Sequence, residues 1–438
     1  MSGAIGGLLS SFSIRPTASL VMNLDATVGA MPGSNITTSA SFDGSTQYLT
    51  LPASTDWALG TGDFTIEWWQ YQTGAGTFPR VFSVGAGPAS IAVSIESGTF
   101  YFWENGNFTF SSVLSSYLTT WVHFAISRVS GQTSVYQNGI KLGSTFSDTN
   151  NINDSSSTLS IGREISAFDT YFPGYISNFR IIKGTGIYTA NFVAPTTTLR
   201  AVSGTVALLP LAAAPFMDMS TNLYTITNNG TTTTTASAPT LTAATTDFTG
   251  TYTITTANAG ASIAYNSATG GLFRKSTSSG TDSMIVGPNY VTGQSYTVFM
   301  AYKLSATSAG RLLNTSSEAV KDWLLGAYNG NPNTFYPNYS VNLPSSGADT
   351  VWHFAWGTFN TGTSLGQLYT ATSTQPTGTS FAVTNSGGGG FNQLRLFSRA
   401  GGSEVQTADI GMIRVYNGVV TLAQVQSQYA AFKARFGY

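Results

Sequence analysis

The chain has 438 residues, of which 42% are hydrophobic and only 8% are charged, and its formal net charge is −1. So little charge offers no electrostatic basis for binding nucleic acid or an anionic membrane surface, and we expect neither partner. The absence of cysteine excludes disulfides, thiolate metal sites and cysteine nucleophiles. No apolar run approaches the roughly 20 residues that span a bilayer, so we expect no membrane insertion.

Residues 1–13 are predicted to form a flexible N-terminal arm. Glycine and serine make the arm mobile, and its large apolar residues could be buried on a partner. These residues are Ile5, Leu8, Leu9 and Phe12. We expect the arm to become ordered when the protein assembles with other proteins, and a frayed terminus is the alternative.

Residues 14–204 are predicted to form the first of two β-sandwiches. Short apolar runs alternate with Gly, Asn and Asp turns, which is typical of antiparallel strands. In the segment 64–71, Phe64, Ile66 and Trp68 fall on one face of such a strand, and Trp69 and Tyr71 also share a face. Asn105-Gly106 and Asn138-Gly139 each separate two strand-like segments and predict two-residue hairpins.

Residues 205–245 are predicted to be a linker. The threonine run at 231–235, followed by Ala, Ser and Pro, suits an extended and exposed connection better than a core strand. The stretch from Val206 to Asn229 could close the first domain or open the second, and the sequence leaves both readings open.

Residues 246–438 are predicted to form a second sandwich that ends in one helix, 421–435. Thr421 suits the N-cap of this helix, and Gln424 three residues later completes a capping-box pattern. The predicted fold class is therefore all-β, with two antiparallel jelly-roll β-sandwiches in tandem and one C-terminal helix.

The only two histidines occur in similar segments, His123 in 121–128 and His353 in 351–358. Each segment is followed some fifty residues later by a strand-like segment with the pattern Ile-x-x-apolar-Arg-apolar. Landmarks repeated in the same order indicate one module used twice. We therefore expect architectural histidines, each half-buried and bonded to neighbouring backbone rather than to a pairing partner.

Several segments together resemble laminin-G-like, concanavalin-A-like jelly rolls. In the first half these are residues 41–50, 62–68, 121–125, 136–139, 159–163 and 174–181. The second half contains segments that resemble a second module of this kind, namely residues 323–326, 351–354 and 415–418 together with the terminal helix. The closing stretch, residues 429–437, is similar to the ends of such domains in virion proteins of tailed phages, particularly marine ones. The resemblance implies a non-enzymatic protein located in the virion, as a capsid decoration, a head fibre or a tail component. Its implied partners are other virion proteins and host-surface glycans, and we expect a homo-oligomer.

Two groups of aromatic and amide residues are candidate glycan-binding sites, because sugars present apolar faces and a ring of hydroxyls. Tyr101 and Trp103 share a strand face and lead into Asn105 and Asn107 at a hairpin. The second group, in the second module, is Tyr328, Asn329, Asn331 and Tyr336. The alternatives are a layer of the sandwich core for the first group and an ordinary structured loop for the second.

A calcium site is the one cofactor considered. The loop Asp148–Asp154 is dense in side-chain oxygens, and hard cations want six to eight of them. The candidate ligands are Asp148, Asn151, Asp154 and Asp169, at a rim where many laminin-G-like domains hold calcium. Asx turns that cap their own backbone are the alternative.

Catalysis is not expected. Some enzymes that resemble this fold carry an E-x-D-x-x-E strand, which places carboxylates on one face. None of the glutamates considered, Glu67, Glu96, Glu104, Glu164, Glu318 and Glu404, is followed by Asp two residues later. The leading hypothesis is a non-enzymatic virion protein with weak glycan adhesion. A dedicated carbohydrate-binding receptor adhesin is the alternative, and a polysaccharide-degrading enzyme is the least favoured.

Overall fold

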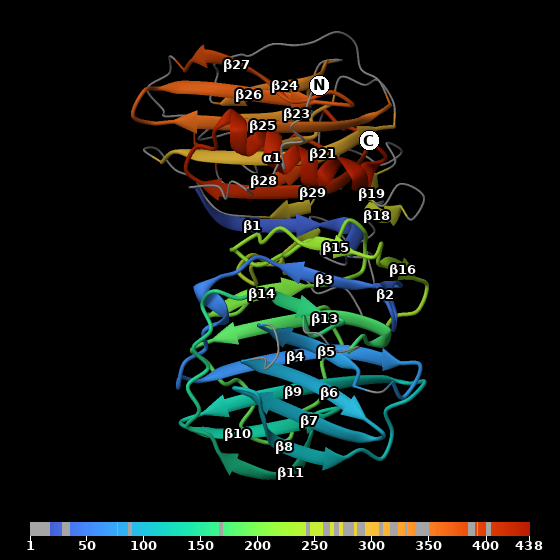
Figure 1. Ribbon diagram of the computed structural model, residues 1–438. Helices are drawn as coiled ribbons and strands as arrows, with labels where there is room; N and C mark the ends of the chain where they lie inside the picture. Colours follow the sequence, from blue (N-terminus) through green and yellow to red (C-terminus); the bar gives the residue numbers. More distant parts are fainter. Residues whose placement is uncertain are drawn as a thin grey trace, which may run out of the picture.

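The structure is a computed structural model of the chain. It describes residues 18–28, 36–76, 78–85, 90–165, 170–241, 246–256, 263–266, 271–274, 284–286, 294–305, 310–315, 323–328, 331–337, 350–383, 390–391, 393–399 and 404–438. Two β-sandwiches lie end to end, and one helix packs on the second of them (Figure 1). The expected all-β class with antiparallel sheets and a C-terminal helix is confirmed.

The first sandwich consists of two antiparallel sheets, which we name the β4 sheet and the β7 sheet. The β4 sheet contains, in spatial order, β11 (Ile140–Ser147), β10 (Gln132–Gln137), β9 (Trp121–Val129), β4 (Phe64–Gln72), β13 (Pro173–Lys183), β2 (Ser39–Asp43) and β16 (Thr233–Thr235), with β14 (Thr205–Leu209) against β13. The β7 sheet contains β15 (Thr227–Asn229), β3 (Tyr48–Leu51), β12 (Leu159–Ile161), β5 (Arg80–Val84), β6 (Ile91–Glu96), β7 (Thr99–Glu104) and β8 (Asn107–Val113). A short 3₁₀ helix, Thr55–Trp57, follows β3.

The second sandwich repeats this plan with the β21 sheet and the β23 sheet. The β21 sheet contains β18 (Ile263–Asn266), β19 (Gly271–Arg274), β29 (Ala408–Asn417), β21 (Tyr296–Leu304), β25 (Trp352–Asn360), β26 (Leu365–Ala371) and β27 (Thr377–Ala382), with β1 (Ser19–Asp25) against β29. The β23 sheet contains β17 (Thr255–Thr256), β20 (Met284–Val286), β28 (Leu394–Leu396), β22 (Leu313–Thr315), β23 (Trp323–Tyr328) and β24 (Asn331–Pro337). The order β13-β4-β9-β10-β11 in one sandwich matches β29-β21-β25-β26-β27 in the other.

Both predicted two-residue hairpins are confirmed. Asn105 and Gly106 connect β7 to β8, and Asn138 and Gly139 connect β10 to β11. All four residues have positive φ, between 49° and 78°. Type I′ turns need this conformation at both central residues, and Asn-Gly adopts it at low cost.

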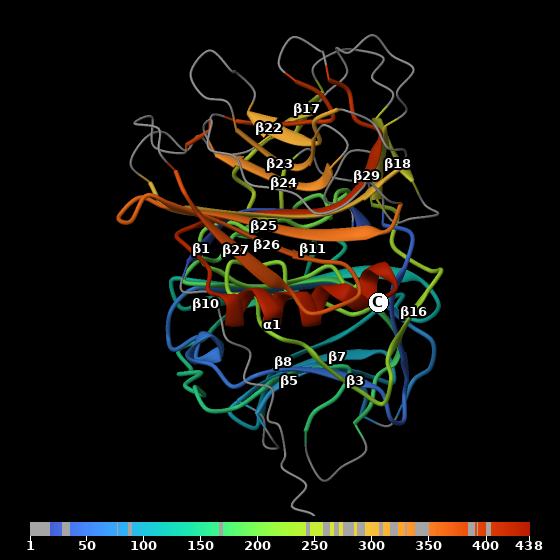
Figure 2. The ribbon, with the colours of Figure 1, turned by 90° about the horizontal axis from the view of Figure 1, so that it is seen from above.

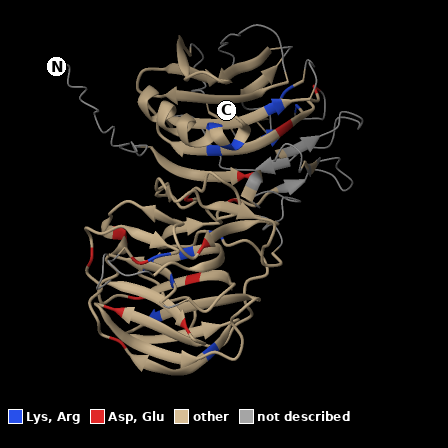
Figure 3. Ribbon diagram, turned by 45° about the vertical axis from the view of Figure 1, so that its right-hand side comes forward, with Lys and Arg blue, Asp and Glu red and all other residues tan. Residues whose placement is uncertain are grey.

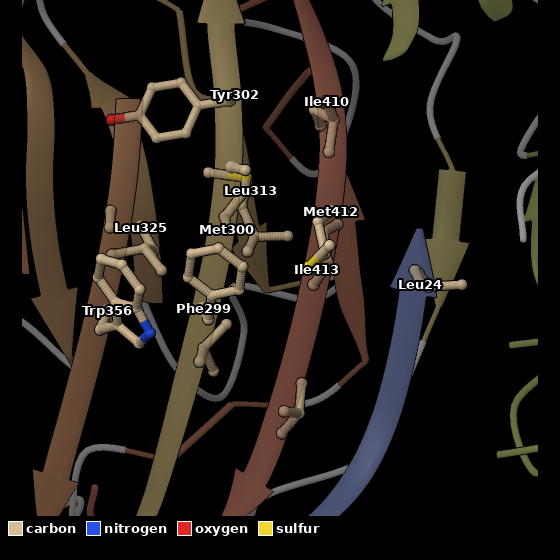
Figure 4. Packing of buried hydrophobic residues seen from close by; sticks show 14 of the residues in the cluster. Leu24, Phe299, Met300, Tyr302, Leu313, Leu325, Trp356, Ile410, Met412 and Ile413 are labelled. Carbon is tan, nitrogen blue, oxygen red and sulfur yellow. The ribbon is translucent and has the colours of Figure 1, made fainter. Parts of the chain in front are cut away.

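The strand assignments differ from the expected domain boundaries at both ends of the first sandwich. β1 pairs with β29 from Ser19 opposite Asn417 to Asp25 opposite Met412, so the first strand of the chain belongs to the second sandwich. Leu24 packs beside Met412 and Ile413 in the core of that sandwich (Figure 4). The N-terminal boundary at residue 14 is therefore wrong for β1, whose apolar residues have their partners in β29.

The segment 205–245 is likewise not a plain linker. β14 pairs with β13, β15 pairs with β3, and β16, which is part of the threonine run, pairs with β2. Threonine is a strand-forming residue, and an extended polar segment can add to a sheet edge when backbone partners are available. This segment therefore closes the first sandwich.

Helix α1 (Leu422–Phe432) lies across the face of the β21 sheet that points away from the β23 sheet (Figure 2). The predicted capping box is confirmed, because Thr421 Oγ1 accepts from Gln424 N and Gln424 Oε1 accepts from Thr421 N. The helix is shorter than expected, since residues 433–436 form a 3₁₀ turn. Tyr429 and Phe432 pack against Phe354 and Phe299 of the sheet, with ring centroids 5.3 and 5.2 Å apart.

The two histidine strands are out of phase by one residue. In β9, Phe124 points into the sandwich, 5.3 Å from Phe100 of the opposite sheet, so His123 points outward. In β25, Phe354 points toward α1, so His353 points inward and stacks on Tyr302, 5.4 Å away. A one-residue slip moves every side chain of a strand to the other face. The similar sequences therefore mark corresponding strands, but the histidines do not occupy corresponding positions.

Candidate functional site

Tyr101 and Trp103 face outward from the β7 sheet. Their neighbours Phe100 and Phe102 are fully buried in the core, so alternation along β7 places the two other aromatic side chains on the opposite face. Both are half-buried. The alternative reading, a layer of the sandwich core, is therefore wrong for this pair.

Phe108 of β8 joins the pair and was missed by the sequence analysis. Its ring centroid lies 6.2 Å from that of Tyr101 and 5.8 Å from that of Trp103, and the side chain is 61% exposed. Asn105 and Asn107, both exposed, follow at the hairpin between β7 and β8. We name these five residues the rim site. The hairpin pairing Trp103 with Phe108 is the signal that could have identified Phe108 from sequence.

Trp103 is held firmly in place. Its indole Nε1 donates to Ser94 Oγ at 3.3 Å, and the guanidinium of Arg80 lies over its ring, 4.8 Å from the centroid. Arg80 is itself fixed by Glu96 at 3.0 Å and Glu164 at 2.8 Å. Because the Trp103 side chain is already immobilised, it loses little conformational entropy when a ligand binds at the rim site.

The hairpin tip lies against the loop proposed for calcium, so the structure brings two separate predictions to one rim. Asn105 Nδ2 donates to the backbone oxygen of Asn151 at 3.4 Å, and Asn150 Nδ2 donates to Glu104 Oε2 at 2.9 Å. Glu104 is almost completely buried beneath the tip. Burial, together with the nearby Asp148 carboxylate, raises the pKa of Glu104 to about 6 despite the hydrogen bond from Asn150.

Two of the four candidate calcium ligands, Asp148 and Asp154, have structural roles in this loop. Asp148 is buried, and its carboxylate accepts from Thr133 Oγ1 at 2.6 Å and from Arg128 Nη1 at 3.4 Å. Asp154 Oδ1 accepts from the backbone nitrogens of residues 156 and 157, the Asx turn that was the alternative reading. Asn151 is exposed, and Asp169 lies outside the described residues.

Within the described part of the chain, no group of three or more His, Cys, Asp or Glu side chains could hold a metal ion. A calcium site at this rim stays a prediction.

The second-module candidates lie at the hairpin between β23 and β24. Tyr328 pairs with Asn331 across this hairpin, and the Arg311 guanidinium lies 5.2 Å from the centre of the Tyr328 ring. Tyr336 is half-buried on β24. Asn329 lies outside the described residues, as do the arm residues Ile5, Leu8, Leu9 and Phe12.

A second aromatic group on the outward face of the β4 sheet was only partly anticipated. Tyr175, Tyr71 and Trp121 are directly paired across β13, β4 and β9, and all three are half-buried. Ring centroids are 5.4 Å apart for Tyr71 and Tyr175 and 5.8 Å apart for Tyr71 and Trp121. The sequence predicts that Tyr71 shares a strand face with Trp69. It does not predict the cross-strand partners Trp121 and Tyr175, which come from segments about 50 and 100 residues away.

His123 belongs to a buried polar cluster on the same face. It is fully buried, and its Nε2 lies 3.2 Å from Glu67 Oε2. Glu67 also accepts from Arg180 Nε at 2.9 Å and from the Tyr188 hydroxyl at 2.8 Å. Both the expected half-burial and the expected lack of a pairing partner are therefore wrong, because the nearest carboxylate is 56 residues away in sequence. The cluster is closed to solvent and fastens the segment around Tyr188 to the sheet.

Positions occupied by Lys, Arg, Asp or Glu are sparse along the ribbon (Figure 3). Among the described residues, no helix combines the length and apolar composition needed to cross a membrane.

The comparisons with known proteins identify the class of the first sandwich. Residues 43–185 match a family model described as the concanavalin A-like lectin/glucanases superfamily. The chain therefore contains a laminin-G-like, concanavalin-A-like jelly-roll domain. No curated protein gives a significant match.

Solved structures of several proteins are similar to this chain at low identity. A Bacteroides ovatus protein described as carbohydrate-binding matches at 14% identity and TM-score 0.39, covering 48% of this chain and 62% of its own. A SAP-like pentraxin of Limulus polyphemus matches at 17% identity and TM-score 0.31, covering 44% of this chain and 94% of its own. Domains LG4-5 of the mouse laminin alpha1 chain match at 11% identity and TM-score 0.27, covering 87% of this chain and 90% of their own.

Proposed function

We propose that this protein is a non-catalytic binding protein that contacts neutral glycans through the rim site. The observation that carries the proposal is the outward-facing aromatic trio, in which Phe108 is exposed and Tyr101 and Trp103 are half-buried, beside two exposed amides. Aromatic rings stack on the apolar faces of sugars, and the amides can exchange hydrogen bonds with sugar hydroxyls. The match of this domain to a lectin-containing superfamily supports the same ligand class.

The rim site favours an uncharged ligand. Nearby charges are already paired with one another, as Arg80 is with Glu96 and Glu164. An anionic or cationic sugar would find no unpaired countercharge among these residues, whereas a neutral sugar needs none. Binding is expected to be weak for a single site, because few side chains contribute and the surface is open.

Replacing Phe108 with alanine tests the glycan proposal. Phe108 is 61% exposed, so its loss should leave folding intact while removing the most accessible stacking surface. Retention of the protein on an array of neutral oligosaccharides, with calcium and with chelator, identifies a ligand. Titration should then show at least about a tenfold weaker Kd for Phe108→Ala, or roughly 1.4 kcal/mol.

The matched control is Phe78→Ala, since Phe78 is 47% exposed outside the rim site. It should bind like the unmodified protein. Failure of every oligosaccharide to bind would contradict the proposal, and so would equal affinities for the two variants. Dependence of binding on calcium would indicate that the neighbouring Asp148–Asp154 loop holds the ion.

The protein exerts this activity as a structural component of a tailed-phage virion, in contact with other virion proteins. The resemblance of residues 429–437 to the ends of phage virion domains supports this role, as does the low charge of the chain. Mass spectrometry of purified particles should detect the polypeptide at a fixed number of copies per particle. Its absence from particles would favour the alternative, a receptor-binding lectin that acts outside the virion.

A further inference from the structure

The sequence contains five Asn-Gly pairs, and four of them lie within the described residues, at 105–106, 138–139, 229–230 and 417–418. Asparagine before glycine is chemically labile, because glycine has no side chain to hinder attack of its backbone nitrogen on the asparagine amide carbon. The two residue types are the same in every pair. Differences in their surroundings therefore decide which pair reacts in the folded protein.

The pair at 138–139 is immobilised by neighbouring segments. Asn138 Oδ1 accepts from His123 N at 2.9 Å, and the Asn138 backbone nitrogen donates to the His123 backbone oxygen at 2.7 Å. Gly139 is buried, and its oxygen accepts from Phe192 N at 2.9 Å. The amide carbon of Asn138 and the nitrogen of Gly139 therefore cannot rotate toward each other unless these bonds break.

The pairs at 229–230 and 417–418 are restrained in other ways. The Asn229 amide donates to the Thr50 hydroxyl and to the backbone oxygen of Thr227, both at 3.3 Å. Gly418 N, the attacking nitrogen of the last pair, donates to the backbone oxygen of Ser295 at 2.9 Å. These bonds have to break before a ring can close, and their cost slows the reaction.

The pair at 105–106 is the least restrained of the four. Asn105 is exposed, and its amide donates to the backbone oxygen of Asn151 at 3.4 Å, near the limit of a hydrogen bond. The Asn105 backbone nitrogen donates to the Ser90 oxygen at 3.0 Å, but that nitrogen takes no part in ring closure.

A neighbouring side chain also activates this pair. Asn107 Nδ2 donates to the backbone oxygen of Asn105 at 3.2 Å. That oxygen belongs to the same peptide unit as the nitrogen of Gly106. The hydrogen bond withdraws electron density from this unit and favours loss of the N–H proton. The hairpin tip thus contains the group that is attacked, the nitrogen that attacks and a donor that activates it.

We propose that Asn105 is a site of spontaneous deamidation, which alters the rim site slowly and irreversibly. Gly106 N gives its proton to hydroxide and attacks Asn105 Cγ. A bond forms between this nitrogen and Cγ, the Cγ–Nδ2 bond breaks, and ammonia leaves. Water then opens the five-membered imide at either carbonyl and returns a proton to the nitrogen, which leaves aspartate or isoaspartate. The oxidation state of every atom is unchanged, so water is the only co-reactant.

The conversion affects glycan binding, and this consequence rests on the proposed function. The product carboxylate cannot donate a hydrogen bond to a sugar hydroxyl or to Asn151, and it adds a negative charge next to Glu104. Isoaspartate also lengthens the backbone of the tip by one carbon, which disrupts the tight turn between β7 and β8. The rim site should therefore lose affinity as the protein ages.

Peptide mass spectrometry of the full chain, aged at mildly alkaline pH, tests the proposal without any glycan. Conversion of Asn105 should be at least about tenfold faster than conversion of Asn138, Asn229 or Asn417 in the same sample. In concentrated urea the four rates should become similar, because the fold no longer restrains any pair. Equal rates in the folded protein would overturn the proposal, and so would an unchanged excess at Asn105 in urea.

Two variants assign the chemistry to named residues. Asn105→Gln keeps an amide at the tip but requires a larger ring, so the mass change in this peptide should disappear; its persistence would place the modification elsewhere. Asn107→Ala removes the donor to the Asn105 oxygen and should slow the conversion roughly two- to tenfold. Ser111→Ala, at an exposed position of β8, is the control and should keep the original rate. Equal rates in Asn107→Ala and Ser111→Ala would refute the activation.

The effect on binding is measured separately. Asn105→Asp reproduces the simpler product and should bind a neutral oligosaccharide at least about threefold more weakly than the unmodified protein. Equal affinities would refute the effect of deamidation on the rim site. If no oligosaccharide binds the unmodified protein, the proposed function fails, whereas faster conversion of Asn105 than of the other pairs can still be measured.

Discussion

Glu67→Gln is expected to destabilise the protein by about 3–5 kcal/mol, which is the cost of leaving a buried charge without its partner. Glu67 is fully buried and holds Arg180, His123 and the Tyr188 hydroxyl. Glutamine has nearly the same shape but no charge, so the buried Arg180 guanidinium loses its counterion. Urea unfolding followed by tryptophan fluorescence measures the loss, and proteolysis near Tyr188 should accelerate.

The loss of stability caused by Glu67→Gln should become smaller as the pH falls. Burial by itself would raise the pKa of Glu67, but Arg180 and His123 outweigh it and lower the pKa from 4.5 to about 2. A carboxyl whose pKa is lower in the folded state stabilises the fold above its unfolded pKa and loses that contribution as it becomes protonated. The difference between the unmodified protein and Glu67→Gln should therefore be constant above about pH 5 and shrink between about pH 4.5 and 2.

Glu96→Gln is the matched control for Glu67→Gln. Glu96 also pairs with an arginine, at 3.0 Å, but Arg80 keeps its second partner Glu164, and the Glu96 side chain is 18% exposed whereas that of Glu67 is fully buried. Removing the Glu96 carboxylate should lower the free energy of unfolding by about 1 kcal/mol or less. The double variant Glu67→Gln/Arg180→Met should recover part of the loss, because no orphan charge remains. Equal destabilisation by the two glutamine variants would contradict a special role for the buried cluster.

The features that the sequence predicts correctly are those whose determinants are local. An Asn-Gly pair carries its own turn geometry, and Thr421 with Gln424 carries its own helix start. Alternation along β7 likewise fixes which side chains share a face, although not which face is buried. Tyr101 and Trp103 could therefore be grouped from sequence, but their outward direction depends on the packing of Phe100 and Phe102 against the opposite sheet.

The features that the sequence does not predict depend on partners far along the chain. β1 pairs with a strand almost 400 residues away, and its own apolar pattern would suit either sandwich. His123 is surrounded by Glu67, Arg180 and Tyr188, which come from three different segments. The two His-Phe-Ala segments are identical in sequence, but their side chains point to opposite faces of their sheets. The phenylalanine packs against α1 in the second sandwich and against the β7 sheet in the first, and this packing fixes which face each histidine takes.

Asp25→Asn is the second substitution for which we expect a large effect, again about 3–5 kcal/mol. Asp25 ends β1 and forms a fully buried ion pair with Arg435, which follows α1. Arg435 Nε also donates to the backbone oxygen of Pro215 at 3.0 Å. The guanidinium thus joins the first strand, the last helical turn and the segment between β14 and β15. Burial lowers the pKa of Arg435 and Asp25 counteracts that effect, so removing the carboxylate takes away the negative charge that favours the buried cation.

Hydrogen exchange distinguishes this effect from general weakening. In Asp25→Asn, amide protection should fall first in β1, β29 and α1, whereas β4, β9 and β13 of the first sandwich keep theirs. Asp154→Asn is the control, since asparagine can form the same Asx turn at that loop and should cost almost nothing. Uniform loss of protection over both sandwiches would mean that they unfold as one unit. Loss confined to the second sandwich would show that both ends of the chain are needed to complete it.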